Sequence, residues 1–190
     1  MPQFDLRGIK IGTYVNTNGT ISYTGVQSAG DAMTANLELR YAEGRLYAES
    51  SLAEFIKKCT GGTISLGVKY IPDAAQKVLF GLTEKTRTVG TASAKSLVTS
   101  AKSSGAYVGV AFYAPDMVDG VEKFTCVFAH KAKFGQPSMT MQTAGESIVF
   151  ATPTTTGEFM ADDSANKELM EAITVDTEAA AQAWITAVLA

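Results

Sequence analysis

The sequence predicts a mainly β fold with α (α+β): an antiparallel β-sandwich or partly closed barrel with a flanking short helix and a C-terminal helix. Several segments alternate apolar and polar residues with the period of two that marks a half-buried strand. Thr (22 residues) and Gly (17 residues) are abundant, whereas charged residues make up only 18% of the chain. Such a composition is typical of sheets and turns that meet other protein surfaces. The length of 190 residues fits a single domain.

The first expected strands lie in the amino-terminal part. Residues 9–15 alternate apolar and polar side chains, Asn18-Gly19 supplies a hairpin turn, and a second strand follows at residues 21–23. Residues 36–41 and 63–70 alternate in the same way. These segments therefore predict strands with one buried face and one face open to solvent or to a partner.

The later strands are more apolar. Residues 107–113 are apolar on both faces, as in a strand that is covered on both sides. A long strand is expected from 122 to 134, with apolar residues at its even positions, and the last strand from 147 to 159. Pro153 favours an edge or bulged position for that last strand, because proline cannot donate a ladder hydrogen bond.

Two helices are expected. Pro72 at the first helical position, Asp73 in the first turn and Gly81 after the last turn bracket a short helix. The second helix runs from Asp176 or Thr177 to about Leu189. Segments 83–104 and 161–167 show no apolar periodicity and are expected to be irregular; a long connection of this kind is usually functional or ordered by a partner.

The net charge of −3 conceals an asymmetry along the chain. Residues 57–102 carry eight basic and two acidic side chains, and residues 157–190 carry one basic and seven acidic side chains. Two interpretations stay open: two solvated faces, or a self-complementary molecule that assembles head to tail into rings or filaments. The acidic balance argues against binding duplex DNA by phosphate neutralisation.

No residue pattern indicates catalysis, a cofactor or a metal. Cys59 and Cys126 lie far apart without the paired spacing of a zinc site, and Asp162-Asp163 with Asn166 is too sparse for a calcium loop. His130, the single histidine, has no carboxylate or nucleophile near it in sequence, so we interpret it as a packed or interface histidine. We therefore expect no catalytic, cofactor-binding or metal site, and no enzyme.

Three segments carry a resemblance to a known family. They are GAYVGV (105–110), KAKFGQP (131–137) and GESIVFATPTTTGEF (145–159), and LYAE (46–49) precedes them. In order and spacing they resemble the major tail (tail tube) proteins of long-tailed bacteriophages and prophages, in which a KGKF..P element precedes GESIEFQTPTLTGTF and a Trp-containing C-terminal segment. The chain departs from that pattern at His130-Lys131-Ala132, where an aromatic residue, Lys and Gly are more usual.

The resemblance implies a structural protomer of a tail tube. Hexameric rings of such proteins stack into a hollow conduit for DNA, which passes through the lumen without specific binding. The implied partners are other copies of the chain and the tape-measure, tail-terminator and distal tail proteins, with no membrane. The implied location is the virion tail, assembled in the host cytoplasm. Residues 1–190 would form one tail-tube domain, with extended arms near 43–60 and 83–104, and strands near 9–23 or 107–133 would line the lumen.

Two alternatives remain at this point. The chain could be a tube protein of a contractile or secretion-type particle, which purified tubes with a sheath would show. It could instead be a monomeric β-sandwich binding or adhesion module of a phage particle, which would behave as a compact monomer.

The charge asymmetry supplies the candidate inter-subunit contacts. They are Lys57, Lys58, Lys85, Arg87, Lys95, Lys102, Glu158, Asp162 and Asp163. Reversing the charge of Arg87 or Lys58 should weaken tube assembly and leave the monomer folded, because only contacts between subunits would change. Electron micrographs that show unchanged tube length and yield would refute this assignment.

Overall fold

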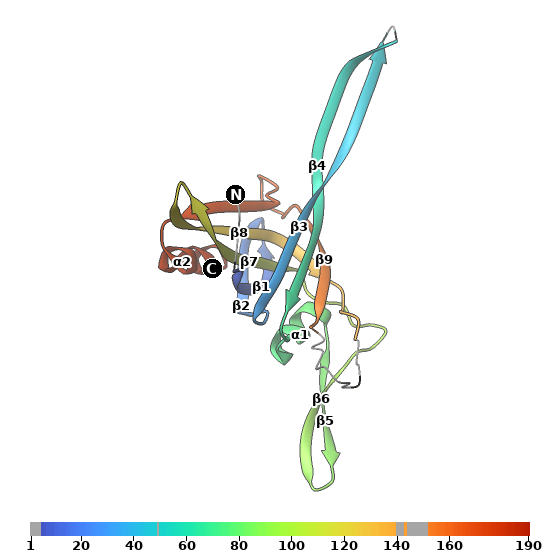
Figure 1. The fold of residues 1–190 in the computed structure, drawn as a ribbon. Coiled ribbons are helices and arrows are strands. Elements are labelled where there is room, and N and C mark those ends of the chain that lie inside the picture. The colour runs from blue at the N-terminus through green and yellow to red at the C-terminus, as the bar shows by residue number, and fades with distance from the viewer. Residues whose placement is uncertain (1–4, 49, 140–142, 144–151) are drawn as a thin grey trace.

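The computed structural model describes residues 5–48, 50–139, 143 and 152–190 (Figure 1). It is mainly antiparallel β with two short helices, which confirms the predicted α+β class. The elements are β1 (Arg7–Thr17), β2 (Thr20–Ser28), β3 (Ala32–Ala48), β4 (Ser51–Val68), α1 (Asp73–Phe80), β5 (Thr83–Val89), β6 (Ala92–Val98), β7 (Val108–Val118), β8 (Val121–Phe134), β9 (Thr154–Met160), β10 (Met170–Val175) and α2 (Glu178–Val188).

One large sheet forms the body. Its strand order is β2-β1-β7-β8-β9-β4-β3, and β10 also pairs with β8. Strand β8 pairs with β7 along one edge. Along its other edge, residues 124–129 pair with β10 and residues 131–134 pair with β9. The neighbour of β8 therefore changes at His130.

Two separate apolar cores cover the faces of this sheet. The first core joins β1, β4, β7, β8 and β9 under α1. Because β1 and β4 lie far apart in the strand order and still share this core, the sheet curls around it, as a sandwich or partly closed barrel does. The second core lies between α2 and the strands β7 and β8 (Figure 1). Its residues include Phe124, Cys126 and Phe128 of β8, Ala181 and Ile185 of α2, and Leu189 at the C-cap of α2.

A β-bulge moves β8 from one core to the other. Val108 and Val110 of β7 pair with Ala132 and Ala129, so β8 has one extra residue between these two pairs. The even positions before the bulge face the α2 core, whereas Ala132 and Phe134 face the first core. The even positions 124–134 of β8 are buried, as the alternation predicted, but the apolar residues among them belong to two different cores.

The helix ends agree with their sequence signals. Helix α1 ends at Gly81, whose φ of 65° is left-handed, and α2 begins after Thr177, whose side chain accepts a hydrogen bond from the Ala180 amide. Pro72 lies at the N-cap of α1, one position earlier than expected. No helix in the described part of the chain is long and apolar enough to cross a membrane.

Three expectations about the elements need correction. Residues 83–98, expected to be irregular, form the β5–β6 hairpin, a separate two-stranded sheet. Strand β10 was not expected at all, and it pairs with β8 over six residues. The last expected strand, 147–159, appears as β9 from Thr154; it lies between β8 and β4 without a register shift, so the edge or bulged position expected from Pro153 is wrong, because Pro153 precedes the strand. Residues 147–151 lie outside the described part.

Replacing Ile185 by Ala should destabilise the protein by about 2–5 kcal/mol, because the change opens a cavity between α2 and β8. Ile185 is 1% exposed in the α2 core, whereas Ile173 on β10 is 41% exposed. The matched change Ile173→Ala should therefore cost less than about 1 kcal/mol. Equilibrium urea unfolding measures both changes, and equal losses would contradict this assignment of the core.

Candidate functional site

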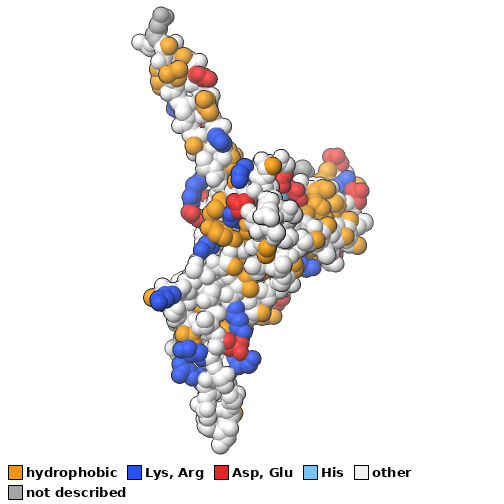
Figure 2. Space-filling view, turned by 180° about the vertical axis from the view of Figure 1, so that it is seen from behind, with side chains coloured by type: hydrophobic (Ala, Val, Ile, Leu, Met, Phe, Trp, Pro, Cys, Tyr) orange, Lys and Arg blue, Asp and Glu red, His pale blue; other side chains and the backbone are white. Residues whose placement is uncertain are grey.

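The most conspicuous surface feature is a long hairpin that leaves the body. We call residues 41–59 of β3 and β4 the β3–β4 arm; Figure 1 shows it projecting well beyond the sheet. Residues 41–48 and 50–58 are all exposed. In Figure 2 apolar side chains follow this arm, whereas the β5–β6 hairpin at the opposite end shows few apolar side chains, with Lys and Arg toward its base. The two hairpins therefore offer different surfaces.

One face of the β3–β4 arm is organised by its own side chains. The register pairs Tyr41 with Cys59, Glu43 with Lys57 and Arg45 with Phe55, so these residues share a face. The Lys57 ammonium lies 4.6 Å from the Tyr41 ring centroid and 3.0 Å from a Glu43 carboxylate oxygen. Arg45 lies 5.5 Å from the Phe55 ring centroid and 3.4 Å from Glu43. This ladder of cross-strand contacts holds the two strands in register.

The opposite face of the arm leaves large apolar side chains in water. Gly44 pairs with Ile56 and Leu46 pairs with Glu54, which places Leu46 and Ile56 on this second face. Both side chains are 60% exposed. Neither belongs to a core of the described residues. An apolar patch on a projecting hairpin is typical of a surface that another protein covers.

The basic candidate residues divide into two groups. Lys57 is held by Glu43, and Lys95 binds Glu84 at 2.7 Å. Glu84 is also bonded by Lys77, and the hydrogen bonds from Lys77 and then Lys95 lower the pKa of Glu84 to about 2. The remaining candidates have no ion-pair partner among the described residues; they are Lys58 on the second face of the arm, Lys85 and Arg87 on β5, and Lys102.

The acidic candidate residues are mostly compensated within the chain. Glu158 binds Arg40 at 2.7 Å, and Asp163 binds Lys131 at 2.7 Å. Asp162 is only 2% exposed, so in this structure it offers no surface to another subunit, contrary to its choice as a contact residue. No ion pair among the described residues joins a basic candidate to an acidic one. The structure therefore does not bring these two sets together within one chain.

The loop between β9 and β10 forms a second candidate site against β8. The Tyr14 hydroxyl accepts a hydrogen bond from the Asp163 amide at 3.0 Å and contacts the Asp163 carboxylate at the same distance. The Lys131 ammonium lies 4.9 Å from the Tyr14 ring centroid and 5.0 Å from the Tyr107 ring centroid. These contacts fix the outer side of the loop on the sheet.

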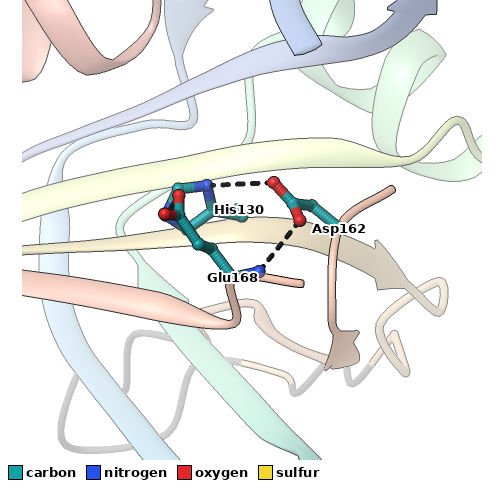
Figure 3. Close-up of side chains that lie close together, drawn as sticks. All are labelled: His130, Asp162 and Glu168. Atoms are coloured by element: carbon teal, nitrogen blue, oxygen red, sulfur yellow. Dashed lines mark hydrogen bonds and ion pairs between the residues drawn. The ribbon is translucent and has the colours of Figure 1, made fainter. Parts of the chain in front are cut away.

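The inner side of the same loop surrounds His130 (Figure 3). His130 Nδ1 lies 3.8 Å from Asp162 Oδ2, and His130 Nε2 lies 3.8 Å from Glu168 Oε2. The His130 amide donates to the Leu169 carbonyl at 3.2 Å, and the Tyr23 hydroxyl donates to the His130 carbonyl at 2.9 Å. The sequence did not predict this cluster, because Asp162 reaches His130 through the pairing of β9 with β8, and Glu168 through the unexpected pairing of β10 with β8.

Comparison with known proteins adds no relative. No family model matches the chain, and no curated protein matches it significantly. The likeness to major tail proteins consequently depends on the residues that carry it, of which Glu49 and 145–151 lie outside the described part of the chain.

Lys131→Met should raise the pKa of Asp163 toward its usual value. The pKa of this carboxyl is lowered first by the hydrogen bond from Lys131 and next by that from Tyr14. A lowered folded-state pKa adds stability above the unfolded pKa, and this stability is lost as the pH falls through the folded value. In the Lys131→Met variant, the ionised Asp163 carboxylate should therefore contribute less to the free energy of unfolding above the pKa range of the carboxyl.

NMR titration of the Asp163 carboxyl carbon measures the shift. Lys133→Met is the matched control, since Lys133 lies over the Tyr107 ring at 5.1 Å and has no ion pair with Asp163 among the described contacts. An Asp163 pKa that is the same in wild type and in Lys131→Met would contradict the role given to Lys131.

Proposed function

We propose that the protein is a structural, non-enzymatic protomer of a bacteriophage tail tube, in which hexameric rings stack into a conduit for DNA. Copies of the same chain are then its main partners, and tape-measure, tail-terminator and distal tail proteins are the others. The hexamer, the virion location and these further partners rest on the resemblance of segments 105–110, 131–137 and 145–159 to major tail proteins.

The observation that carries the proposal is the β3–β4 arm. An isolated two-stranded hairpin is marginally stable in water at best. The arm nevertheless exposes large apolar side chains on both of its faces. Leu46 and Ile56 lie on one face, and Tyr47 and Phe55 lie on the other. Burying one such side chain contributes about 1.5–3 kcal/mol. Contact with a neighbouring copy would supply this burial and would order the arm.

The ends of the large sheet support assembly in a ring. Strands β2 and β3 terminate the strand order, so each has an outer edge that no described strand pairs. Unpaired edges are open to pairing with another chain, and repeated head-to-tail pairing closes into a ring when the rotation permits. Such pairing between β2 of one copy and β3 of the next would satisfy both edges without new secondary structure.

The charge distribution agrees with a conduit. Two of the six basic candidates are paired within the chain, Lys57 with Glu43 and Lys95 with Glu84, and the net charge is −3. Affinity for DNA through phosphates rises with the number of unpaired cations at the surface. A wall with an acidic net charge, in which part of the cations is compensated internally, would let DNA pass without holding it tightly.

The double variant Leu46→Asp/Ile56→Asp should abolish rings and tubes at concentrations where wild type forms them. Two charges would then face the apolar surface that the neighbour provides, which should raise the concentration needed for assembly more than about tenfold. Negative-stain electron microscopy over a concentration series measures this threshold.

Val121→Asp is the matched control. Val121 is 59% exposed at the β7–β8 turn, away from the arm. Its substitution by Asp should therefore leave the concentration needed for assembly unchanged. Circular dichroism establishes that all variants are folded. A wild-type protein that stays monomeric at every concentration, or a double variant that assembles normally, would overturn the proposal.

A further inference from the structure

The cluster around His130 combines three side chains from different parts of the chain. His130 lies on β8, Asp162 follows the end of β9, and Glu168 precedes the start of β10 (Figure 3). One ligand atom from each residue lies within 4.8 Å of the other two. The three residues meet where the neighbour of β8 changes from β10 to β9, beside the bulge that separates the two cores. Bulges frequently aim a side chain into a site.

The histidine ring has an unsatisfied atom. His130 is 9% exposed, and its Nε2 is buried without any hydrogen-bond partner among the described residues. Its nearest carboxylate oxygen, Glu168 Oε2 at 3.8 Å, is beyond hydrogen-bonding distance. Buried polar side-chain atoms nearly always have a partner. The arrangement therefore indicates a partner that the chain itself does not supply.

Only one oxygen of the buried Asp162 carboxylate accepts hydrogen bonds from the described residues. Asp162 Oδ1 accepts hydrogen bonds from the Ser164 amide at 3.1 Å, the Ser164 hydroxyl at 2.6 Å and the Glu168 amide at 2.9 Å. No hydrogen bond of the described residues reaches Asp162 Oδ2, which faces the His130 ring. The nearby ammonium of Lys131 is engaged by Asp163 instead. Two carboxylates therefore face one imidazole, and no described Lys or Arg pairs with either of them.

We propose that His130, Asp162 and Glu168 bind one divalent transition-metal ion, for which Zn²⁺ is the best match. Zinc takes imidazole nitrogen and carboxylate oxygen at about 2.0–2.2 Å in a tetrahedral site. One ring nitrogen and one oxygen from each carboxylate supply three ligands, and water completes the fourth position. The ion would neutralise the two carboxylates and give the ring its missing partner.

Binding requires only a small movement. Tetrahedral ligands at those bond lengths stand about 3.4 Å apart, so the present separation of up to 4.8 Å must shrink. The Glu168 side chain is 47% exposed and can move toward the other two. His130 and Asp162 are already held by the backbone and by loop hydrogen bonds. The ion would pin loop 161–169 to β8, and this role does not depend on the proposed tube function.

Titration calorimetry of the metal-free full-length protein with Zn²⁺ tests the site, at a concentration below the assembly threshold. We expect one Zn²⁺ per chain and a higher unfolding temperature with zinc, because the ion binds the folded state alone. Glu168→Gln removes an exposed ligand and should weaken binding more than about tenfold, since even residues that only orient ligands contribute 10–100-fold. His130→Gln should weaken it at least as much.

Asp176→Asn is the control, because Asp176 is an exposed carboxylate after β10, outside the cluster, and pairs with Lys123. It should bind Zn²⁺ as wild type does. The visible spectrum of bound Co²⁺ should indicate tetrahedral coordination and disappear in Glu168→Gln. The proposal would be overturned if the wild-type protein bound no Zn²⁺, or if the titration heat came from proton exchange alone. Equal Zn²⁺ binding by wild type and Glu168→Gln would overturn it as well. The exposed Glu168 keeps the test decisive even if His130→Gln does not fold.

Discussion

Strand β8 is the element on which the rest of the structure depends. One edge pairs with β7, and the other pairs with β10 and then β9. Its bulge lets a single strand bury side chains in both cores, one under α1 and one under α2. The change of neighbour also occurs at His130, where the β9–β10 loop returns to the sheet. The path of β8, with its bulge and its change of neighbour, therefore determines both the body of the protein and the His130 cluster.

The two projecting hairpins follow from the size of this body. The cores use only the body ends of β3 and β4, and no other described element covers residues 41–48 and 50–58. Local contacts such as Lys57 on the Tyr41 ring keep the strands in register but leave Leu46 and Ile56 in water. A partner surface is the remaining source of stabilisation, and a second copy of the chain is the partner that the proposed tube provides.

The sequence predicted elements best where burial imposes a pattern. Alternation located β1 and β8, a run that is apolar on both faces located β7, and the signals at Thr177 and Gly81 located the helix ends. The β5–β6 hairpin was not predicted, because both of its faces are largely exposed and its strands therefore show no apolar periodicity. The His130 cluster could not be predicted from spacing, because Asp162 and Glu168 come close only after β9 and β10 pair with the same strand. Tertiary pairing rather than local sequence created that site.

Hydrogen–deuterium exchange of the β3–β4 arm tests the central claim of self-assembly most directly. In dilute monomer the amides of residues 41–59 should exchange rapidly compared with those of β7 and β8, since the arm has no covering surface. In concentrated protein the same amides should become protected, in parallel with the appearance of rings, while the body changes little. Exchange from the arm that is identical in dilute and concentrated protein, although rings are present, would contradict the account.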